Sequence, residues 1–194
     1  MPYLGNTPTS VPLTSADIAD GIITSAKIAN GTISSADLAS GVGGKFLQVV
    51  STTKTDTFVS NPSSSWIDVT GLSVSITPSS SSNKILIQIS ISGSGVTGTN
   101  TAHFRLVRGS TVIYAGNTSG NRSSGFASCI DSDPNSTEHV SGNFLDSPST
   151  TSSTTYKIQT WSNNTVYVNR TSNDIDDGTR SRGASTITVM EIAS

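Results

Sequence analysis

The sequence predicts an all-β protein: a C-terminal, jelly-roll-like β-sandwich preceded by an extended stalk of repeats. From residue 45 onward, about ten short segments rich in β-branched residues alternate apolar and polar positions, which is typical of half-buried strands. Clusters of Gly, Ser, Asn and Pro separate these segments, and none has the apolar period of a long helix. Before residue 45, a ten-residue motif occurs three times in succession.

The expected strands follow one another at short intervals, and frequent turns between them favour a sandwich, with a jelly roll as its arrangement. They span residues 46–50, 53–59, 66–70, 72–77, 85–91, 102–108, 111–114, 125–130, 138–145, 155–161, 166–170 and 185–192. Segment 85–91 begins with consecutive apolar residues, which predicts a central strand that is buried on both faces. The short turn between 102–108 and 111–114 predicts a hairpin.

The last expected strand, 185–192, runs almost to the end of the sequence. A hydrophobic terminal strand of this kind usually lies in the middle of a sheet, where its neighbours fix it. We expect Ile187, Val189 and Met190 to point inward. The whole sandwich covers residues 45–194, which is long enough to bury an independent core.

The repeats occupy residues 14–44 and keep their positions in register. Each decapeptide begins with Ser-Ala, has Ile or Leu at its fourth position and has Gly at its seventh. Ser can cap a helical turn and Gly tolerates the left-handed backbone that ends one, so each repeat predicts a short turn followed by an extended piece. The large apolar positions are Ile18, Ile23, Ile28, Ile33 and Leu38.

One such repeat cannot bury its own apolar side chains. Ordering the backbone costs about 1–2 kcal/mol per residue, whereas burying one Ile returns only about 1.5–3 kcal/mol. We therefore expect these five side chains to converge on an axis shared with other copies of the chain. A flexible linker rich in Ser, Ala and Gly is the alternative, although linkers seldom keep Ile in strict register.

Residues 1–13 contain three prolines, which disfavour both a helix and a central strand. We expect an extended arm, and its apolar side chains Tyr3, Leu4, Val11 and Leu13 could dock on a partner. A frayed terminus is the alternative interpretation of the same residues.

Composition excludes several classes of protein. Charged residues make up 12% of the 194 residues and the net charge is −2, with no basic patch of the kind that binds nucleic acid. No apolar run approaches the roughly 20 residues of a membrane span, and the first residues lack the features of a secretory signal. Cys129 is the only cysteine, so packing must hold the fold, and synthesis in a reducing cytoplasm is compatible with the sequence.

The sequence contains no motif that predicts catalysis. A nucleophile elbow, a P-loop and a dinucleotide fingerprint are all missing, so we expect no enzymatic activity and no cofactor. His103 and His139 do not stand at the spacing of metal ligands. Segment 173–178 resembles part of a calcium loop but lacks the distal Glu, and we expect no metal site.

Ligand contacts are expected on long polar loops, because binding residues usually sit on loops carried by a rigid scaffold. The alternation within 155–161 places Trp161 on the face opposite Tyr156, where an exposed indole could stack on a sugar ring. The candidate contacts are Trp161, Asn121, Arg122, Asp176 and Arg180.

Several phrases of the sequence resemble fibre proteins of tailed bacteriophages, especially phages of cyanobacteria and other aquatic bacteria. Met-Pro-Tyr-Leu-Gly-Asn-Thr-Pro at the start and the Ser-Ala-Lys-Ile-Ala-Asn-Gly repeat resemble the N-terminal regions of these fibres. Further stretches are similar to the head domain that often follows: 45–58, 68–78, 104–111, 144–148 and 185–192. The resemblance covers nearly the whole chain.

The resemblance implies a homotrimeric virion fibre, made in the host cytoplasm and placed on the particle surface. Residues 1–13 would attach to other virion proteins, 14–44 would form a thin stalk and 45–194 a distal knob. A tail fibre that adsorbs to a host-surface glycan or protein is the first expectation, with the candidate contacts above as receptor-binding residues. A head or collar fibre, or a capsid-decorating protein, is the alternative; a cell-surface adhesin or lectin is disfavoured because no signal peptide is evident.

Overall fold

The computed structural model describes most of the chain, which divides into two compact units, residues 1–44 and 45–194. The described residues are 14, 18–34, 37–38, 45–94, 101–130 and 133–194. The predicted attachment residues Tyr3, Leu4, Val11 and Leu13 lie outside them. Within the described part, no helix is long and apolar enough to cross a membrane.

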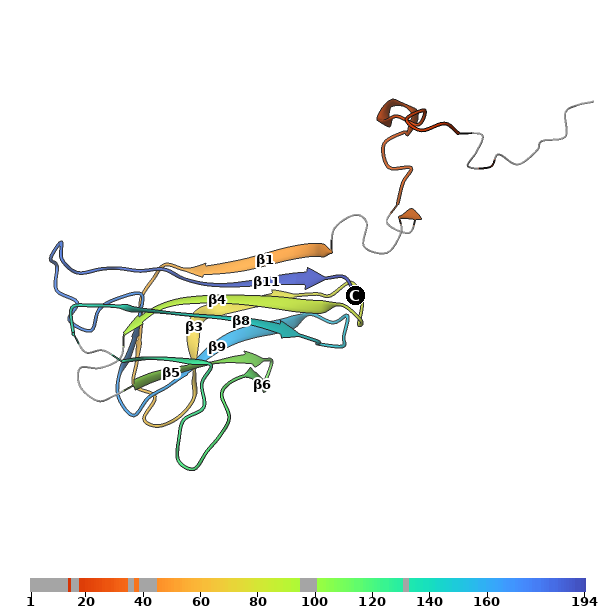
Figure 1. Ribbon diagram of the computed structural model, residues 1–194. Coiled ribbons are helices and arrows are strands. Elements are labelled where there is room, and N and C mark those ends of the chain that lie inside the picture. Colours follow the sequence, from red (N-terminus) through yellow and green to blue (C-terminus); the bar gives the residue numbers. More distant parts are fainter. Residues whose placement is uncertain (1–13, 15–17, 35–36, 39–44, 95–100, 131–132) are drawn as a thin grey trace, which may run out of the picture. The chain divides into compact units, whose positions relative to one another are not determined.

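The C-terminal unit consists of two antiparallel β-sheets (Figure 1). The first sheet contains β1 (Phe46–Lys54), β11 (Ser185–Ile192), β4 (Lys84–Ser94), β10 (Val166–Val168) and β2 (Phe58–Ser60) in that order, and β8 (Glu138–Asp146) also pairs with β4. The second sheet contains β3 (Ile67–Ile76), β9 (Thr154–Trp161), β5 (Thr101–Arg108) and β6 (Thr111–Tyr114), and β7 (Ala127–Ile130) also pairs with β5. The predicted all-β class is confirmed, and the two sheets are consistent with a sandwich.

The hydrophobic core of this unit is built by alternate residues of the two sheets. Ile85, Ile87 and Ile91 of β4 are fully buried, as are Phe104 of β5 and Ile158 of β9. Burying one such side chain stabilises the fold by about 1.5–3 kcal/mol relative to leaving it in water. The period-two pattern of the sequence thus has its expected cause, because successive strand residues point to opposite faces.

Strand β4 is central, as predicted, because it pairs with β11, β8 and β10. The prediction that it is buried on both faces is wrong for its first half, where Leu86 is only half-buried and Gln88 is exposed. Four consecutive residues at its end, Ile91–Ser94, are buried. There the main chain at Asn169 donates to the carbonyl of Ser92 at 2.8 Å, which continues the pairing of β4 with β10.

Two segments that the sequence separates at Gly71 form the single strand β3. Gly71 has a φ of +83°, a conformation that side chains with a Cβ rarely adopt. The register with β9 shifts between Asp68 and Ser73, so the glycine lies within a bulge rather than a turn. A Cβ at Gly71 would also lie 3.3 Å from the Lys54 Nζ.

The last strand, β11, lies between β1 and β4, and the predicted hairpin of β5 and β6 is present. Ile187 and Val189 point inward, as predicted. Met190 does not: it is half-buried on the outer face, and the inward position belongs to Glu191, which is fully buried. A charged side chain can occupy that position only if polar partners replace the water that it loses.

Neutral donors supply those partners. The Glu191 carboxylate accepts hydrogen bonds from the Ser79 main chain at 2.6 Å, from Asn83 Nδ2 at 2.7 Å and from Gln48 Nε2 at 2.5 Å. Burial alone would raise the pKa of Glu191, but the bonds from Asn83, Gln48 and Ser79 outweigh it and bring the pKa down to about 2. One carboxylate thereby joins β11, β1 and the turn before β4.

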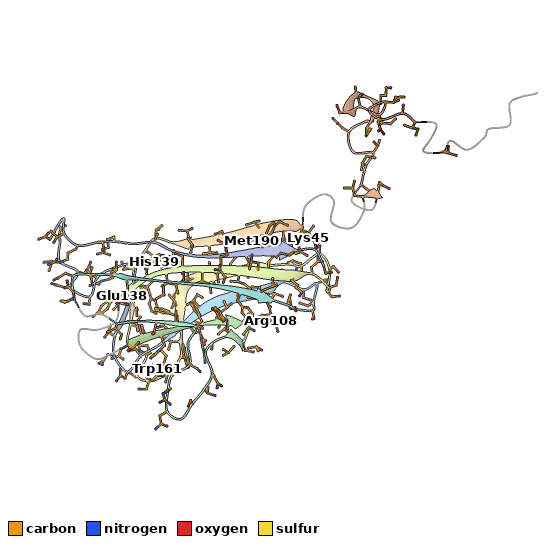
Figure 2. The ribbon with its side chains drawn as sticks, viewed as in Figure 1. Lys45, Arg108, Glu138, His139, Trp161 and Met190 are labelled. Atoms are coloured by element: carbon orange, nitrogen blue, oxygen red, sulfur yellow. The ribbon has the colours of Figure 1, made fainter. Side chains whose placement is uncertain are left out.

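A second polar cluster joins the two sheets. The hydroxyl of Tyr156, on β9, donates to Asp146 Oδ2, on β8, at 2.7 Å. Arg108 of β5, labelled in Figure 2, donates to both carboxylate oxygens of Asp146 at 2.8 Å. Burial and the neighbouring Asp146 carboxylate raise the pKa of Tyr156. The phenol therefore stays protonated as a donor between the sheets.

The described residues of the N-terminal unit form repeated turns. A 3-10 turn spans Ser25–Lys27, and both Gly21 and Gly31 have left-handed φ values, +79° and +81°. The residue after each of these glycines donates to a carbonyl three positions earlier, Ile22 to Ala19 at 3.2 Å and Thr32 to Ala29 at 3.1 Å. The repetition in the sequence is thus also a repetition in backbone conformation.

The expected capping by Ser25 is not observed. Thr24 is the residue before the turn and makes no side-chain capping bond. In the next repeat the cap is reversed: the Asp37 carboxylate accepts from the Ser34 main chain at 2.8 Å and from its hydroxyl at 2.7 Å. The corresponding position after Thr24 is Lys27, which cannot accept a hydrogen bond, so the two repeats are capped differently.

We predict that stability of the C-terminal unit depends on the charge of Glu191. Because its pKa lies below the ordinary value of 4.5, the ionised carboxylate stabilises the fold above that pH, and this contribution is lost as the pH falls toward about 2. Glu191→Gln should lower the free energy of unfolding at pH 7 by about 1–3 kcal/mol, because the amide NH2 group would face a donor where a carboxylate oxygen now accepts.

Urea unfolding of the native chain and Glu191→Gln between pH 2 and 7 measures this. The variant should lose much of the native pH dependence below pH 5. Equal slopes against pH in the two proteins would contradict the role given to Glu191. Glu138→Gln, on the exposed start of β8, is the matched control.

Candidate functional site

The loop between β10 and β11 forms a small polar pocket on the C-terminal unit. Asp174 holds the loop together: its carboxylate pairs with Arg182 at 2.6 Å and with Arg170 at 3.3 Å. Arg170 and Arg182 also form an isolated antiparallel bridge through their main chains. The loop therefore closes on itself around one carboxylate.

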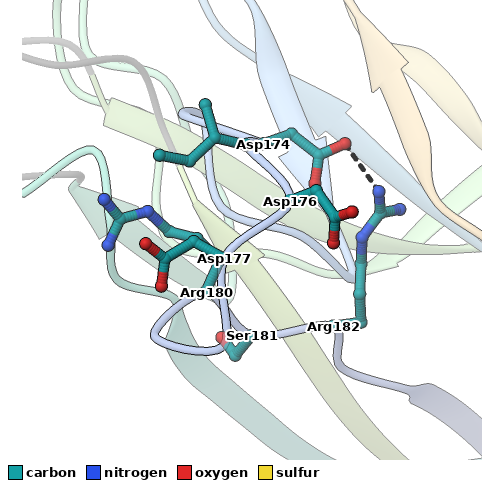
Figure 3. A pocket seen from close by; sticks show the side chains of 7 residues that line it. Asp174, Asp176, Asp177, Arg180, Ser181 and Arg182 are labelled. Carbon is teal, nitrogen blue, oxygen red and sulfur yellow. Dashed lines mark hydrogen bonds and ion pairs between the residues drawn. The ribbon is translucent and has the colours of Figure 1, made fainter.

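The pocket inside this loop has a volume of about 250 Å³ (Figure 3). Its lining residues are Asp174, Ile175, Asp176, Asp177, Arg180, Ser181 and Arg182. The structure thus brings together two of the predicted contact residues, Asp176 and Arg180. Within the described part of the chain, the buried Nε of Arg180 has no hydrogen-bond partner. This atom is closed to solvent, so a ligand acceptor could reach it only after the Arg180 side chain moved.

The turn at one wall of the pocket is held by Asp177. Its carboxylate accepts from the Thr179 main chain and from the Thr179 hydroxyl, both at 2.8 Å. These hydrogen bonds, together with the nearby Arg180 charge, lower the pKa of Asp177. The pocket therefore presents carboxylates and guanidinium groups side by side. Such mixed charge suits a neutral polar ligand, such as a sugar, better than a polyanion.

Trp161 lies elsewhere, at the end of β9 on the outer face of the second sheet. Its indole is half-buried, with the ring of His103 at 5.5 Å between centroids. Burial lowers the pKa of His103, which favours the neutral imidazole at pH 7. Tyr156 points to the opposite, buried face, as the alternation predicts.

Beside Trp161, a ladder of polar side chains crosses the same sheet. The guanidinium of Arg105 lies 4.2 Å from the centre of the Trp66 ring and donates from Nε to Gln159 Oε1 at 2.8 Å. Gln159 and Lys157 each donate to the Asp68 carboxylate at 2.7 Å. These groups satisfy one another, and Arg105 lies over the Trp66 ring. This ladder was not predicted from the sequence, although alternation within each strand places its members outward.

Asn121 and Arg122 lie on the loop that precedes β7, and both are exposed. Arg122 donates to the Ser119 carbonyl at 3.4 Å, within its own turn. In Figure 1 this loop, drawn in green, and the loop that follows β10, drawn in blue, lie apart. The five predicted contact residues therefore do not form one site: Asp176 and Arg180 share a pocket, and the others stand on separate surfaces.

The apolar positions of the repeats are exposed in the single chain. Their exposed fractions are Ile18 43%, Ile23 55%, Ile28 39%, Ile33 52% and Leu38 36%. Ile28 and Ile33 line the same shallow pocket, which is formed by one repeat. Ile22 is exposed as well, at 47%, and was not among the predicted axis residues. Within the described repeats, these side chains find no core.

The two histidines lie on different sheets, His103 on β5 and His139 on β8. His139 Nε2 and the Ser90 hydroxyl share a hydrogen bond at 2.6 Å. Among the residues that the structure describes, no group of three or more His, Cys, Asp or Glu side chains could hold a metal ion.

Comparison of the chain with models of known protein families, and with curated proteins, gave no match. The phage-fibre resemblance of the sequence motifs therefore stays an interpretation of those motifs. A two-sheet fold also hosts many unrelated functions, so function has to be inferred from particular surfaces.

We predict that Asp174→Asn loosens the pocket loop. The substitution removes the charge that faces both Arg170 and Arg182, and should lower the free energy of unfolding by about 1 kcal/mol. Thermal unfolding compares it with Asp176→Asn, a control from the exposed part of the same pocket. Equal melting temperatures of the two variants would show that Asp174 does not hold the loop.

Proposed function

We propose that the chain is a non-enzymatic structural fibre of a tailed-phage virion. In this proposal residues 1–13 attach to other virion proteins, 14–44 form a stalk shared by three copies, and 45–194 form a jelly-roll-like knob. The observation that carries it is the exposure of in-register isoleucines along the repeats, from Ile18 to Ile33. A side chain of this kind is stabilised only when another surface removes it from water.

The repeats fit a shared axis better than a linker. Their turns recur with the same backbone conformation at Gly21 and Gly31, whereas a linker needs no such regularity. The same turn recurs after ten residues, so Ile18 and Ile28, each the fourth residue of its repeat, occupy equivalent positions in successive repeats. Three copies placed side by side could cover these residues, and the trimer is the assembly that the sequence resemblance implies.

The knob would serve to contact the host. Its chain passes between the two sheets repeatedly, from β3 to β4 to β5 and from β8 to β9, which supports a jelly-roll arrangement. The pocket around Asp176 and Arg180 is the favoured receptor contact, since it is a polar hollow lined by two of the predicted contact residues. A host-surface glycan or protein is the proposed ligand, and Trp161, Asn121 and Arg122 are further candidates.

A tail fibre is the first proposal because a ligand pocket on the knob suits adsorption. A head or collar fibre, or a capsid-decorating protein, would use the same stalk and arm on another part of the particle. An adhesin or lectin would use the knob alone, and leaves the repeats without a role.

Immunogold electron microscopy of purified particles distinguishes a position on the tail from one on the head, collar or capsid. Antibody raised against residues 45–194 should label the tail at the distal end of fibres. Labelling of the capsid or collar would overturn the tail assignment and favour the alternative. An absence of label from intact particles would overturn the virion proposal, provided that the antibody recognises the purified chain.

We predict that light scattering will show an assembly of three copies of the full chain. We also predict that Ile28→Asp weakens this assembly. An unpaired carboxylate at a covered axis position should raise the concentration needed for assembly at least about tenfold, which is about 1.4 kcal/mol. Asn30→Asp introduces the same charge at an exposed polar position of the same repeat and should assemble normally. A monomeric native chain, or identical assembly of both variants, would contradict the stalk.

A further inference from the structure

The outer face of the first sheet carries a continuous apolar row. In the strand register Val49 stands opposite Met190, Met190 opposite Leu86, and Leu86 opposite Leu145. These residues come from the neighbouring strands β1, β11, β4 and β8. Directly opposed side chains in an antiparallel sheet are close enough to touch, so the four form one band across the sheet.

The band is exposed rather than part of the core. Val49 is 60% exposed and Leu145 is 49% exposed, while Leu86 and Met190 are half-buried by their neighbours. Phe46, 59% exposed, extends the band by one more register position. A contiguous apolar surface of this kind on a soluble domain marks an interaction site more often than an accident of composition.

The band borders uncharged surface. The next register row consists of Ser51, Thr188, Gln88 and Asn143, and beyond it stand Thr53, Thr186, Ser90 and Ser141. The hydroxyl groups of Ser51 and Thr188 already bond to each other at 2.7 Å. Among the outward positions of these two rows no side chain is ionised, whereas on the other side of the band Lys84 stands in the register row of Phe46 and Ile192. The same surface on neighbouring copies can therefore approach over the uncharged rows, with Lys84 left at the rim of the contact.

We propose that this band, Val49, Leu86, Leu145, Met190 and Phe46, is a contact between copies of the chain at the level of the head. The occupants are the same bands on the other copies of the chain, which would meet around the fibre axis, and this part of the inference rests on the three-copy fibre proposed above. Lys45 follows the repeats directly in sequence, and Figure 2 shows Lys45 and Met190 at one end of the sheet and His139 toward the other. The apolar end of the face is thus the end that carries Lys45, the first residue of the C-terminal unit.

The contact is made by the face of the sheet and not by its edge. Strand β1 is an edge strand, which could in principle add a strand from another molecule. Its register shifts between Phe46 and Gln48, so the row of main-chain groups that strand addition needs is interrupted at the end of β1 that carries the band. The exposed side chains point away from that edge.

Thiol labelling of the assembled full chain tests the proposal. Val49→Cys places a small thiol in the band, and Val112→Cys places one on β6 of the other sheet, where the native side chain is 40% exposed. The native thiol Cys129 is buried in both proteins. Maleimide should label Val49→Cys at least about tenfold more slowly than Val112→Cys, as expected for a site that is open only in a minor fraction of molecules. In urea both thiols should react alike.

Light scattering on the same samples distinguishes the two proposals. If light scattering shows three copies in each assembly, equal labelling rates of the two cysteine variants would overturn the head contact and leave the stalk proposal intact. Equal rates in a monomeric chain would overturn both. A further pair of variants guards against a local effect of cysteine. Leu145→Lys should weaken assembly, whereas Ser141→Lys, four residues earlier on the same outer face of β8, should not. Identical assembly of these two variants would also count against the contact.

Discussion

The burial of apolar side chains is the main constraint on this chain. The C-terminal unit has two sheets that cover each other, so residues such as Ile87 and Phe104 are fully buried within one copy. The described residues of the repeats have no second layer, and Ile23 and Ile33 remain more than half exposed. Apolar side chains are therefore removed from water within one copy in the C-terminal unit and left in contact with water in the described repeats.

Within the C-terminal unit, buried polar groups fix how the two sheets and their turns meet. The ionised Glu191 accepts hydrogen bonds from three residues and connects the last strand to the turn at Ser79 and Asn83. Asp146 connects the sheets through Tyr156 and Arg108. Apolar contacts alone tolerate small shifts between layers, whereas hydrogen bonds of this kind have one geometry. The surfaces that carry the pocket and the apolar band are thereby held in place.

Much of the fold could be predicted because strand patterns are local: the inward residues of β9 follow from alternation alone. The choice between Met190 and Glu191 could not, because a buried carboxylate depends on Ser79 and Asn83, more than a hundred residues away. Asp176 and Arg180 were predictable as one site since they share a loop. The row from Val49 to Leu145 depends on the register of four strands, which no local pattern contains.

A density map of the assembled chain, with the repeats resolved, would show directly whether three copies share an axis along the repeats. It should show three copies around one axis, with Ile28 and its equivalents facing that axis and removed from water. A map in which residues 18–34 follow a solitary path, with Ile18, Ile28 and Ile33 all facing solvent, would contradict the shared axis and leave only an independent β-domain.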